Sequence, residues 1–243
     1  ATCKVETFGF SEKADLRADN VNLVSTPGHL GVAYTVSGLM NFDVEIDIPG
    51  TFSVYNSLTA IAVCRHFDVP VEKITAALKV AKVKGRIEMI KVSDNFTLMI
   101  DYAHNGESLR RLLSDLRAYK PRRLICLFGS VGERTQLRRV QLGEAAAELA
   151  DLCVLTADNP GREDPMKIIF EISSALLGTR TPYFAIPDRE QAIREAVRLC
   201  REGDFLVLAG KGHETYQLIE GERIPFSEKE ILLDEKDALL PTV

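Results

Sequence analysis

Four polar clusters in the later part of the chain carry the residue types that bind charged ligands and transfer protons. They read DYAHNGES (101–108), GSVGERTQ (129–136), DNPGREDP (158–165) and GKGHETYQ (210–217). Each combines carboxylates, guanidinium groups, amides or an imidazole with a glycine that lets the backbone approach a ligand closely. The last cluster also suggests nucleotide binding, because a Gly-Lys pair after an apolar run is typical of loops that bind phosphates.

The Gly-Lys pair does not belong to a P-loop. That loop has the pattern G-x-x-x-x-G-K-[ST], in which the hydroxyl beside the lysine binds Mg²⁺. Here Lys211 is followed by Gly212, and no glycine precedes Gly210 at the required spacing. No other stretch of the sequence has the pattern. The GKGHE stretch (210–214) must therefore serve another purpose.

The polar clusters stand among apolar runs that are typical of buried strands. Strands that alternate with helices predict a parallel sheet covered on both faces. Right-handed crossovers bring the carboxyl ends of such strands to one edge, where ligands bind, so we expect the clusters to meet there. The expected strands are 97–101, 123–129, 152–157, 182–186 and 204–210, and the expected helices are 106–118, 136–150, 165–177 and 188–201.

The first part of the chain has a different pattern. Residues 1–50 give short alternating runs broken by Gly, Pro and Asn, which predict strands of a mixed or antiparallel sheet. Two helical patterns follow, at 51–67 and 71–83, and the regular strand–helix alternation begins at about residue 89. At the other end, residues 216–228 predict a hairpin that turns at Glu220 and Gly221.

The bulk composition excludes several classes of protein. With 46% hydrophobic and 27% charged residues the chain matches an ordinary globular protein, and its net charge of −5 gives no general attraction to nucleic acid or to an anionic membrane. No apolar run approaches the roughly 20 residues of a membrane span, and no signal peptide is evident.

The five cysteines are scattered without a C-x-x-C pair, which argues against a zinc site and favours a cytoplasmic location. Cys126 and Cys153 lie in strand patterns and are expected to be buried.

The order of short motifs along the chain resembles that of the Mur ligases. The resemblance covers essentially the whole chain and is strongest to the branch that adds the third residue of the peptidoglycan stem peptide. Its most discriminating features are D-N-P at 158–160 and G-K-G-H-E at 210–214. The motifs that carry it are YNSLTAIAV (55–63), KGRIE (84–88), DYAHN (101–105), FGSVGER (128–134), TADNPGREDP (156–165) and LAGKGHETYQ (208–217).

The resemblance implies a domain organisation. Family members have a UDP-sugar domain, a central ATPase domain with a P-loop, and a C-terminal Rossmann-like domain. Residues 1–88 resemble the second half of the central domain and residues 89–243 the whole C-terminal domain. We therefore expect an α/β fold whose mostly parallel, Rossmann-like sheet has helices on both faces. The P-loop half and the carbamylated lysine that holds a second metal have no counterpart, so we expect a fragment that does not hydrolyse ATP by itself.

The implied reaction is ATP-dependent amide-bond formation in peptidoglycan synthesis. The D-glutamyl carboxylate of UDP-MurNAc-L-Ala-D-Glu attacks the γ-phosphate of ATP, and the amine of a diamino acid then attacks the acyl phosphate. Mg²⁺ and cationic side chains spread the phosphoryl charge, so positioning dominates catalysis. We expect the Mg²⁺ ligands to lie mostly outside this sequence and predict no metal ligands within it. The expected partners are these small molecules, with no nucleic acid or membrane, and the full-length enzyme is expected to be a monomer.

The resemblance assigns the nucleotide to one set of residues. Asn56, in a helical apolar stripe, otherwise caps or bonds locally, but in the family the matching Asn reads the adenine edge. Arg86 has the pattern of a solvated charge, but the matching family residue lies at the domain hinge and reaches the ATP phosphates. Asp101 ends a strand and would otherwise cap the next helix. By the resemblance Asp101 contacts ATP and His104 lines the same place, and closure of the domains excludes water from the acyl phosphate. Arg86, Asp101 and His104 are the predicted catalytic residues.

Three of the clusters resemble the pocket for the incoming amino acid. Arg134 is expected to pair with a substrate carboxylate. Asp158 and Asn159, before Pro160, form an Asx-type turn on one reading and contact the amino and carboxylate ends of the substrate on the other. Gly210 allows close backbone approach, and Glu214 offers a negative partner for a side-chain ammonium. His213 is equally a scaffold residue or a proton-transfer group.

Gly161 bears on which diamino acid is added. Family members that take meso-diaminopimelate have D-N-P-R, in which the arginine binds the distal carboxylate. This chain has Gly161 at that place and Arg162 one position later. Because burying an unpaired carboxylate is costly, the sequence favours L-lysine or L-ornithine, although a different loop path would let Arg162 take over the role.

Other readings of the sequence are weaker. A folate polyglutamate or cyanophycin type of ligase shares the fold, but the D-N-P and G-K-G-H-E motifs argue against it. A dinucleotide-binding oxidoreductase or a non-catalytic nucleotide-binding domain would need G-x-G-x-x-G after its first strand, which GSVGER (129–134) does not supply. The sequence leaves open a naturally short chain that pairs with a separate P-loop subunit.

Overall fold

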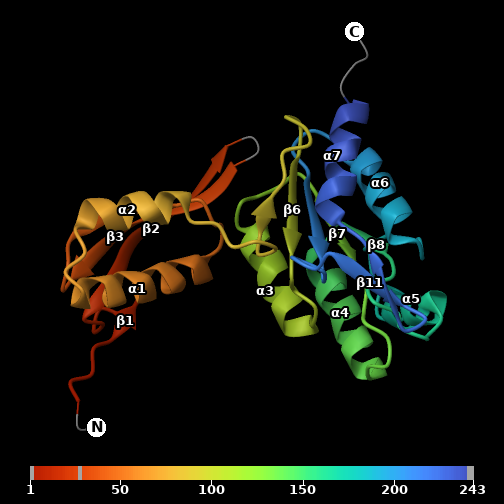
Figure 1. The fold of residues 1–243 in the computed structure, drawn as a ribbon, viewed down its shortest axis with the longest axis horizontal. Coiled ribbons are helices and arrows are strands. Elements are labelled where there is room, and N and C mark those ends of the chain that lie inside the picture. Colours follow the sequence, from red (N-terminus) through yellow and green to blue (C-terminus); the bar gives the residue numbers. More distant parts are fainter. Residues whose placement is uncertain (1–2, 27–28, 240–243) are drawn as a thin grey trace. The chain divides into compact units, whose positions relative to one another are not determined.

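The structure is a computed structural model that describes residues 3–26 and 29–239. The chain divides into two compact units, Ala1–Lys82 and Val83–Val243 (Figure 1). The division falls before residue 88 because Glu88 and Met89 form strand β5 of the second unit's sheet. The assignment of the two parts to family domains stays a prediction.

The first unit is a mixed four-stranded sheet, in the order β1-β2-β3-β4, that packs against two helices. Strand β1 runs parallel to β2, and the other pairs are antiparallel. The helix α1 buries Val54, Leu58 and Ile61, whose spacing places them on one face. The elements are β1 (Phe8–Gly9), β2 (Leu16–Thr26), β3 (His29–Gly38), β4 (Phe42–Ile46), α1 (Thr51–His66) and α2 (Val71–Val80).

Strand β2 was not predicted from the sequence. Its first part buries Leu16 and Ala18, but the strand then bulges between Asp19 and Asn22, with Asn20 at a positive φ of 52°. Beyond the bulge the strand is largely exposed, so the alternation of apolar and polar residues that marks a half-buried strand is lost. The rest of the prediction for this part, a mixed sheet followed by two helices, is confirmed.

The second unit contains a six-stranded sheet in the order β5-β6-β10-β7-β8-β9, in which β5 alone is antiparallel to its neighbour. Strands β6, β7, β8 and β10 are buried along their whole length, as expected of a sheet covered on both faces. The strands are β5 (Glu88–Met89), β6 (Thr97–Asp101), β7 (Leu124–Phe128), β8 (Leu152–Leu155), β9 (Tyr183–Ala185) and β10 (Phe205–Ala209).

Five helices accompany this sheet, and the strand order explains where they lie. The connections through α3, α4 and α5 all advance across the sheet from β6 to β9, whereas α6 returns from β9 to β10. Right-handed crossovers therefore place α6 on the opposite face, where α7 packs beside it (Figure 1). The helices are α3 (Gly106–Arg117), α4 (Gln136–Leu149), α5 (Pro165–Ser173), α6 (Arg189–Leu199) and α7 (Glu228–Leu239).

The predicted fold class is confirmed, and the differences are local. Helix α7 and the short strand β5 were not predicted; the buried apolar residues of α7 among those described are Ile231 and Leu232, too few to give a helical stripe. The terminal hairpin, β11 (Tyr216–Ile219) and β12 (Glu222–Pro225), is confirmed. Its turn residues Glu220 and Gly221 both have positive φ, as two-residue hairpin turns require.

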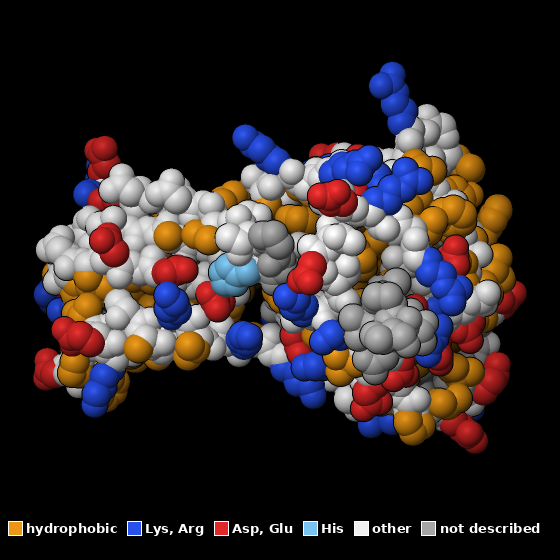
Figure 2. All heavy atoms as spheres, turned by 90° about the horizontal axis from the view of Figure 1, so that it is seen from above, with side chains coloured by type: hydrophobic (Ala, Val, Ile, Leu, Met, Phe, Trp, Pro, Cys, Tyr) orange, Lys and Arg blue, Asp and Glu red, His pale blue; other side chains and the backbone are white. Residues whose placement is uncertain are grey.

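The described part of the chain has no helix long and apolar enough to cross a membrane. Figure 2 shows one face of the molecule, on which acidic and basic side chains are interspersed and hydrophobic side chains lie between them. Cys126 and Cys153 are buried in β7 and β8, as predicted, and burial raises the pKa of the Cys153 thiol to about 12. Both thiols are therefore expected to be unreactive core groups.

Candidate active site

The four polar clusters meet at the carboxyl edge of the six-stranded sheet. They surround a cavity of about 350 Å³, near the lower limit for small-molecule sites and suited to a ligand the size of an amino acid. All of the lining residues belong to the second unit. They are Tyr102, His104, Val131, Arg134, Arg138, Asp158, Asn159, Gly210, Glu214, Tyr216, Leu218 and Arg223.

The structure brings most of the predicted amino-acid-binding residues to this pocket. Six residues predicted for the two sites line it: His104, Arg134, Asp158, Asn159, Gly210 and Glu214. Pro160 and Gly161 continue the loop that holds Asp158 but are not among the lining residues, and neither are Arg86 and Asp101. Whether any of them contacts a substrate stays a prediction.

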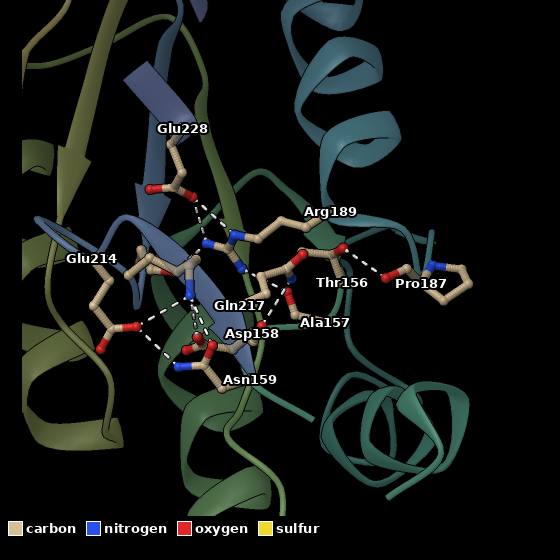
Figure 3. A network of polar contacts seen from close by, with 11 residues as sticks. Thr156, Ala157, Asp158, Asn159, Pro187, Arg189, Glu214, Gln217 and Glu228 are labelled. Atoms are coloured by element: carbon tan, nitrogen blue, oxygen red, sulfur yellow. Dashed lines mark hydrogen bonds and ion pairs between the residues drawn. The ribbon is translucent and has the colours of Figure 1, made fainter. Parts of the chain in front are cut away.

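A buried lysine neutralises the acidic side of the pocket. Lys211 is fully buried, and its Nζ donates to Asn159 Oδ1 at 3.0 Å and to Glu214 Oε2 at 3.1 Å (Figure 3). The amide of Asn159 also donates to Glu214 Oε2, at 2.9 Å. Sequence reasoning treated Glu214 as a partner for a substrate ammonium, but one of its oxygens already accepts two hydrogen bonds from within the protein.

Asp158 retains an unused acceptor. Its Oδ1 is buried without a hydrogen-bond partner and lies 3.5 Å from Lys211 Nζ, close enough for an ion pair but not aligned as a hydrogen bond. The other oxygen lies against Gly210, where an added Cβ would come within 2.9 Å of it. Because a buried acceptor without a donor is costly, this atom is suited to receive a donor from a ligand, such as an ammonium group.

An ion pair behind the pocket joins the two strand ends that carry these loops. Arg189 donates to the carbonyls of Ala157 and Ala209, each at 3.0 Å, which immediately precede Asp158 and Gly210. The same guanidinium pairs with the carboxylate of Glu228, the first residue of α7, and both side chains are buried (Figure 3). Burial raises the pKa of Glu228, and Arg189 opposes that rise. Sequence reasoning missed Arg189, because an arginine at the first position of a helix has no pattern that distinguishes it from a solvated charge.

Three arginines give the pocket a cationic side. Arg138 donates to the carbonyl oxygen of His104 through Nε at 3.2 Å and through Nη2 at 2.8 Å. The guanidinium of Arg223 lies over the ring of Tyr216, 4.6 Å from its centroid. Arg134 is exposed on the loop after β7. Of these, only Arg134 was predicted, since neither Arg138 in a helix nor Arg223 in a hairpin belongs to one of the four clusters.

Close packing joins two of the pocket loops. The N–H of Gly132 donates to the Asn159 carbonyl at 2.8 Å, and a Cβ at Gly132 would lie 1.9 Å from the oxygen of Pro160. No side chain fits at that position. At the next residue of the same loop, the N–H of Glu133 donates to Glu163, which also pairs with the buried guanidinium of Arg139. The arginine holds the pKa of Glu163 at about 2.

The residues predicted to bind nucleotide have different surroundings. Asp101 is buried at the end of β6, and its oxygens accept from the backbone N–H groups of Ile87 and Ala103 at 2.8 and 2.7 Å. Burial raises its pKa, and those two hydrogen bonds oppose the rise. Asp101 does not cap the next helix, because Asn105 does so. Asp101 instead fastens the KGRIE segment to the sheet.

Arg86 and His104 both contact the ring of Tyr102. The exposed guanidinium of Arg86 lies 4.8 Å from the centroid of Tyr102, and the ring of His104 meets Tyr102 at 4.8 Å edge-on. Gly85 is pressed against the GKGHE loop, since a Cβ there would lie 2.2 Å from the His213 nitrogen. This arrangement presents a cation on an aromatic platform, which suits an anionic ligand.

The expectation that Asn56 lies in the apolar stripe of its helix is wrong. Asn56 is exposed on α1, on a different face from the buried Val54 and Leu58. It belongs to the first unit, and its predicted contact with adenine stays a prediction.

The pocket does not fit a divalent cation. A divalent cation needs several anionic ligands at once, and the two carboxylates of the pocket, Asp158 and Glu214, are both already shared with the Lys211 ammonium. Elsewhere in the described residues, His29, Glu45 and Asp47 of the first unit place ligand atoms within 4.8 Å of one another. That group is partly exposed, and no further observation points to a cation there.

Comparison with known proteins agrees with this geometry. The family described as "Mur ligase, glutamate ligase domain" matches residues 85–212. A 2,6-diaminopimelate-adding UDP-N-acetylmuramoyl-L-alanyl-D-glutamate ligase of Caldanaerobacter subterraneus subsp. tengcongensis is 42% identical over 231 residues, which are 94% of this chain and 47% of that protein. The ligase of the same name from Clostridium perfringens is 36% identical over 95% of this chain and 47% of its own length. The chain thus spans about half the length of the curated relatives it matches.

Solved structures give the same result. A structure of UDP-N-acetylmuramoyl-L-alanyl-D-glutamate–2,6-diaminopimelate ligase superposes with a TM-score of 0.71 at 28% identity, over 98% of this chain and 49% of that one. A folylpolyglutamate synthase of Mycobacterium tuberculosis superposes with a TM-score of 0.63 at 17% identity, over 82% of this chain and 46% of that one, which shows a shared fold alone. The motifs, the sheet order and the family match agree, and the chain belongs to the Mur ligase family.

Proposed function

We propose that this chain supplies the amine-substrate pocket of an ATP-dependent ligase that adds 2,6-diaminopimelate to UDP-MurNAc-L-Ala-D-Glu. The observation that carries the proposal is the charge pattern of the pocket: a buried Asp158 oxygen without a donor stands with three guanidinium groups around one cavity. A molecule with ammonium and carboxylate groups at both ends matches that pattern. The full-length relatives are named for the same amino acid.

The charge pattern speaks against the preference for lysine or ornithine that the sequence suggested. That preference rested on Gly161, which leaves no cation after the D-N-P motif for a second carboxylate, and Glu214 was separately expected to receive a side-chain ammonium. Glu214 Oε2 is instead engaged by Lys211 and Asn159, and Arg134, Arg138 and Arg223 line the cavity. The named substrate of the relatives likewise does not support the earlier preference.

The pocket residues have roles in binding and orientation rather than in the chemistry of activation. Asp158 accepts a hydrogen bond from the ammonium of the incoming amino acid, and Arg134 pairs with the neighbouring carboxylate. Holding the amine in place turns the attack on the acyl phosphate into an effectively unimolecular step. Arg86, on the ring of Tyr102, is the described cation best placed for a terminal phosphate.

Activation of the D-glutamyl carboxylate needs more than these residues provide. ATP with Mg²⁺ supplies the phosphoryl group that makes the carboxylate reactive. The sequence has no P-loop pattern that would bind the phosphates of ATP. We therefore assign the ATP-dependent step to the complete ligase, with Asn56, Arg86, Asp101 and His104 as the contributions of this chain.

Calorimetric titration of the chain with meso-diaminopimelate, L-lysine, L-ornithine and L-glutamate tests the proposal. We expect diaminopimelate to bind most tightly and Asp158→Ala to weaken it about 10- to 100-fold, as loss of a charged hydrogen bond does. Exposed Glu107, which pairs with Arg111 on α3, provides the control variant Glu107→Gln, which should bind normally. Preferential binding of L-glutamate would support the folate type of ligase instead, and preferential binding of lysine would restore the earlier preference.

A further inference from the structure

The loop beside the pocket has a glycine at position 161, and Arg223 is among the residues that line the cavity. We propose that Arg223, on strand β12, binds the carboxylate at the far end of the amino-acid substrate and selects a dicarboxylic diamino acid over a monocarboxylic one. This inference rests on the proposed function and names the residue that gives the pocket its specificity. Four features of the loop and the hairpin carry it.

Gly161 forms backbone hydrogen bonds with the hairpin and is not among the residues that line the pocket. Its N–H donates to the Leu218 carbonyl at 2.9 Å, and its own carbonyl accepts from the N–H of Glu220 at 2.6 Å. The residue has a positive φ of 63°, a conformation that strains any residue with a Cβ. The place of that Cβ lies 3.7 Å from the carboxylate of Glu133. An arginine here would be strained and would begin beside an acidic group, so position 161 is unsuited to supply a cation.

Arg162 does not replace the missing side chain. Its guanidinium lies at the hairpin turn, with Nη2 and Nε at 3.7 and 3.8 Å from the place a Cβ of Gly221 would take. It is exposed and is not among the residues that line the cavity. The loop therefore directs this arginine to the turn of the hairpin.

The register of the hairpin directs Arg223 to the cavity. Leu218 pairs with Arg223 across the two strands, and Tyr216 lies two residues before Leu218. Alternation along a strand places all three side chains on one face of the hairpin. All three line the cavity, so the backbone register accounts for the face on which Arg223 lies.

Tyr216 contacts cations from both parts of the pocket. The Lys211 ammonium lies 5.7 Å from the ring centroid, and the Arg223 guanidinium lies 4.6 Å from it. The ring thus lies close both to the ammonium of the buried Lys211 and to the guanidinium of the exposed arginine. A guanidinium that stacks on a ring through its flat face keeps its edge N–H groups for a carboxylate. One end of a substrate at Asp158 and the other at Arg223 would then span this ring.

The remaining arginines have other roles. Arg138 is held by two hydrogen bonds to the His104 carbonyl. Arg134, on the loop that contacts the Asp158 loop through Gly132, is suited to the carboxylate beside the reacting amine. Arg223 is thus the lining cation that belongs to neither of these loops and that stands on the hairpin.

The test compares two arginine variants by calorimetric titration with meso-diaminopimelate and L-lysine. We expect Arg223→Gln to weaken diaminopimelate binding about 10- to 100-fold and to change lysine binding less than about threefold, because lysine has no second carboxylate. Arg223→Glu should reverse the preference in favour of lysine. The matched control Arg162→Gln removes an exposed arginine of the neighbouring loop and should leave both affinities unchanged.

Thermal unfolding of each variant checks that the hairpin is intact; because Arg223 is exposed, its midpoint should stay close to that of the unmodified chain. Equal diaminopimelate affinity in the unmodified chain and in Arg223→Gln would overturn this inference and leave the proposed function standing. A larger loss in Arg162→Gln, or an equal loss of lysine and diaminopimelate in Arg223→Gln, would also overturn it. If the unmodified chain prefers L-glutamate or lysine, the proposed function fails first.

Discussion

The two edges of the six-stranded sheet use the same kinds of residue for opposite purposes. At the amino edge, Asp204 precedes β10, and its carboxylate accepts from Arg123 and from the N–H of Arg201. Asp151 precedes β8 in the same way and accepts from the N–H of Leu124 and from Arg117. These contacts join the starts of β7, β8 and β10 to one another.

At the carboxyl edge some buried carboxylate oxygens have no hydrogen-bond donor. Four buried side-chain atoms of the described residues have no hydrogen-bond partner, and two of them are the carboxylate oxygens Asp158 Oδ1 and Glu228 Oε2. The first lines the pocket, and the second belongs to the ion pair behind it. An edge that only had to be stable would not leave buried acceptors without donors. The difference supports the proposal that stability is given up for binding at the carboxyl edge.

The largest expected effect concerns Arg189, the buried arginine of the carboxyl edge. Arg189→Met leaves Glu228 buried without its partner and should lower the free energy of unfolding by about 3–5 kcal/mol. It should also abolish diaminopimelate binding, because Arg189 holds the carbonyls before Asp158 and Gly210. Denaturant unfolding and calorimetric titration measure the two effects.

The matched variant is Arg123→Met at the amino edge. Asp204 is buried but keeps the N–H of Arg201 as a donor when the partly exposed Arg123 is replaced, so the loss of stability should be smaller, and binding at a temperature where the variant is folded should be unchanged. If Arg123→Met impaired binding as strongly as Arg189→Met, the two edges would not differ in the way described here.

The next largest effect is steric. Gly132→Ala forces a Cβ into the Pro160 carbonyl, which is 1.9 Å away, and should cost about 1–3 kcal/mol while separating two pocket loops. Binding of diaminopimelate should weaken with it. The control is Gly178→Ala in the connection after α5, where nothing lies within 4 Å of the added methyl group. Its positive φ makes that substitution mildly destabilising too, but its binding should be normal.

The ion pair of Glu163 with Arg139, next to the pocket loops, should make stability depend on pH. The pKa of Glu163 is lowered from 4.5 to about 2, chiefly by Arg139, so the stabilisation from this pair is complete above pH 4.5 and is lost as the pH falls toward 2. Glu163→Gln should therefore be less stable than the unmodified chain by about 1–2 kcal/mol at pH 6, after screening by solvent. The difference should shrink between pH 4.5 and 2. A difference that is constant with pH would show that the charge of Glu163 does not contribute.

The smallest effect is expected at the exposed ion pairs of the amino edge. Asp151→Asn keeps an acceptor for the N–H of Leu124 and loses only its charge toward the partly exposed Arg117. Stability should fall by about 0.2–1 kcal/mol, and binding should not change. A larger loss would mean that this edge depends on charge as strongly as the pocket edge does.

The sequence was sufficient for the sheet and for the position of the site, but not for the pairing of charges within it. Strands β6, β7, β8 and β10 are continuous apolar runs, and parallel topology then forces the clusters that follow them to one edge. Strand β2 and helix α7 were missed because tertiary contacts, not local pattern, stabilise them. The preference for lysine, which the comparisons do not support, is replaced in our proposal for a related reason.

Side-chain contacts between distant residues could not be inferred from motifs. Lys211 engages Glu214, the hairpin register directs Arg223 to the pocket, and the positive φ of Gly161 depends on its bonds to Leu218 and Glu220. Each of these joins segments that lie apart in the sequence or depends on a backbone angle. Family motifs identify which residues are near a substrate, but the charge that remains available there depends on their partners.

The central claim, that the carboxyl edge binds a diamino dicarboxylic acid while the amino edge is structural, is tested most directly by backbone amide NMR. The chain would be titrated with meso-diaminopimelate, and the shift of each assigned amide would be recorded. We predict that the largest changes occur at Asp158, Gly210, Lys211 and Arg223, and that Asp151 and Asp204 do not change. Saturable shifts centred on the amino edge, or no saturable shifts at the carboxyl edge, would contradict the account.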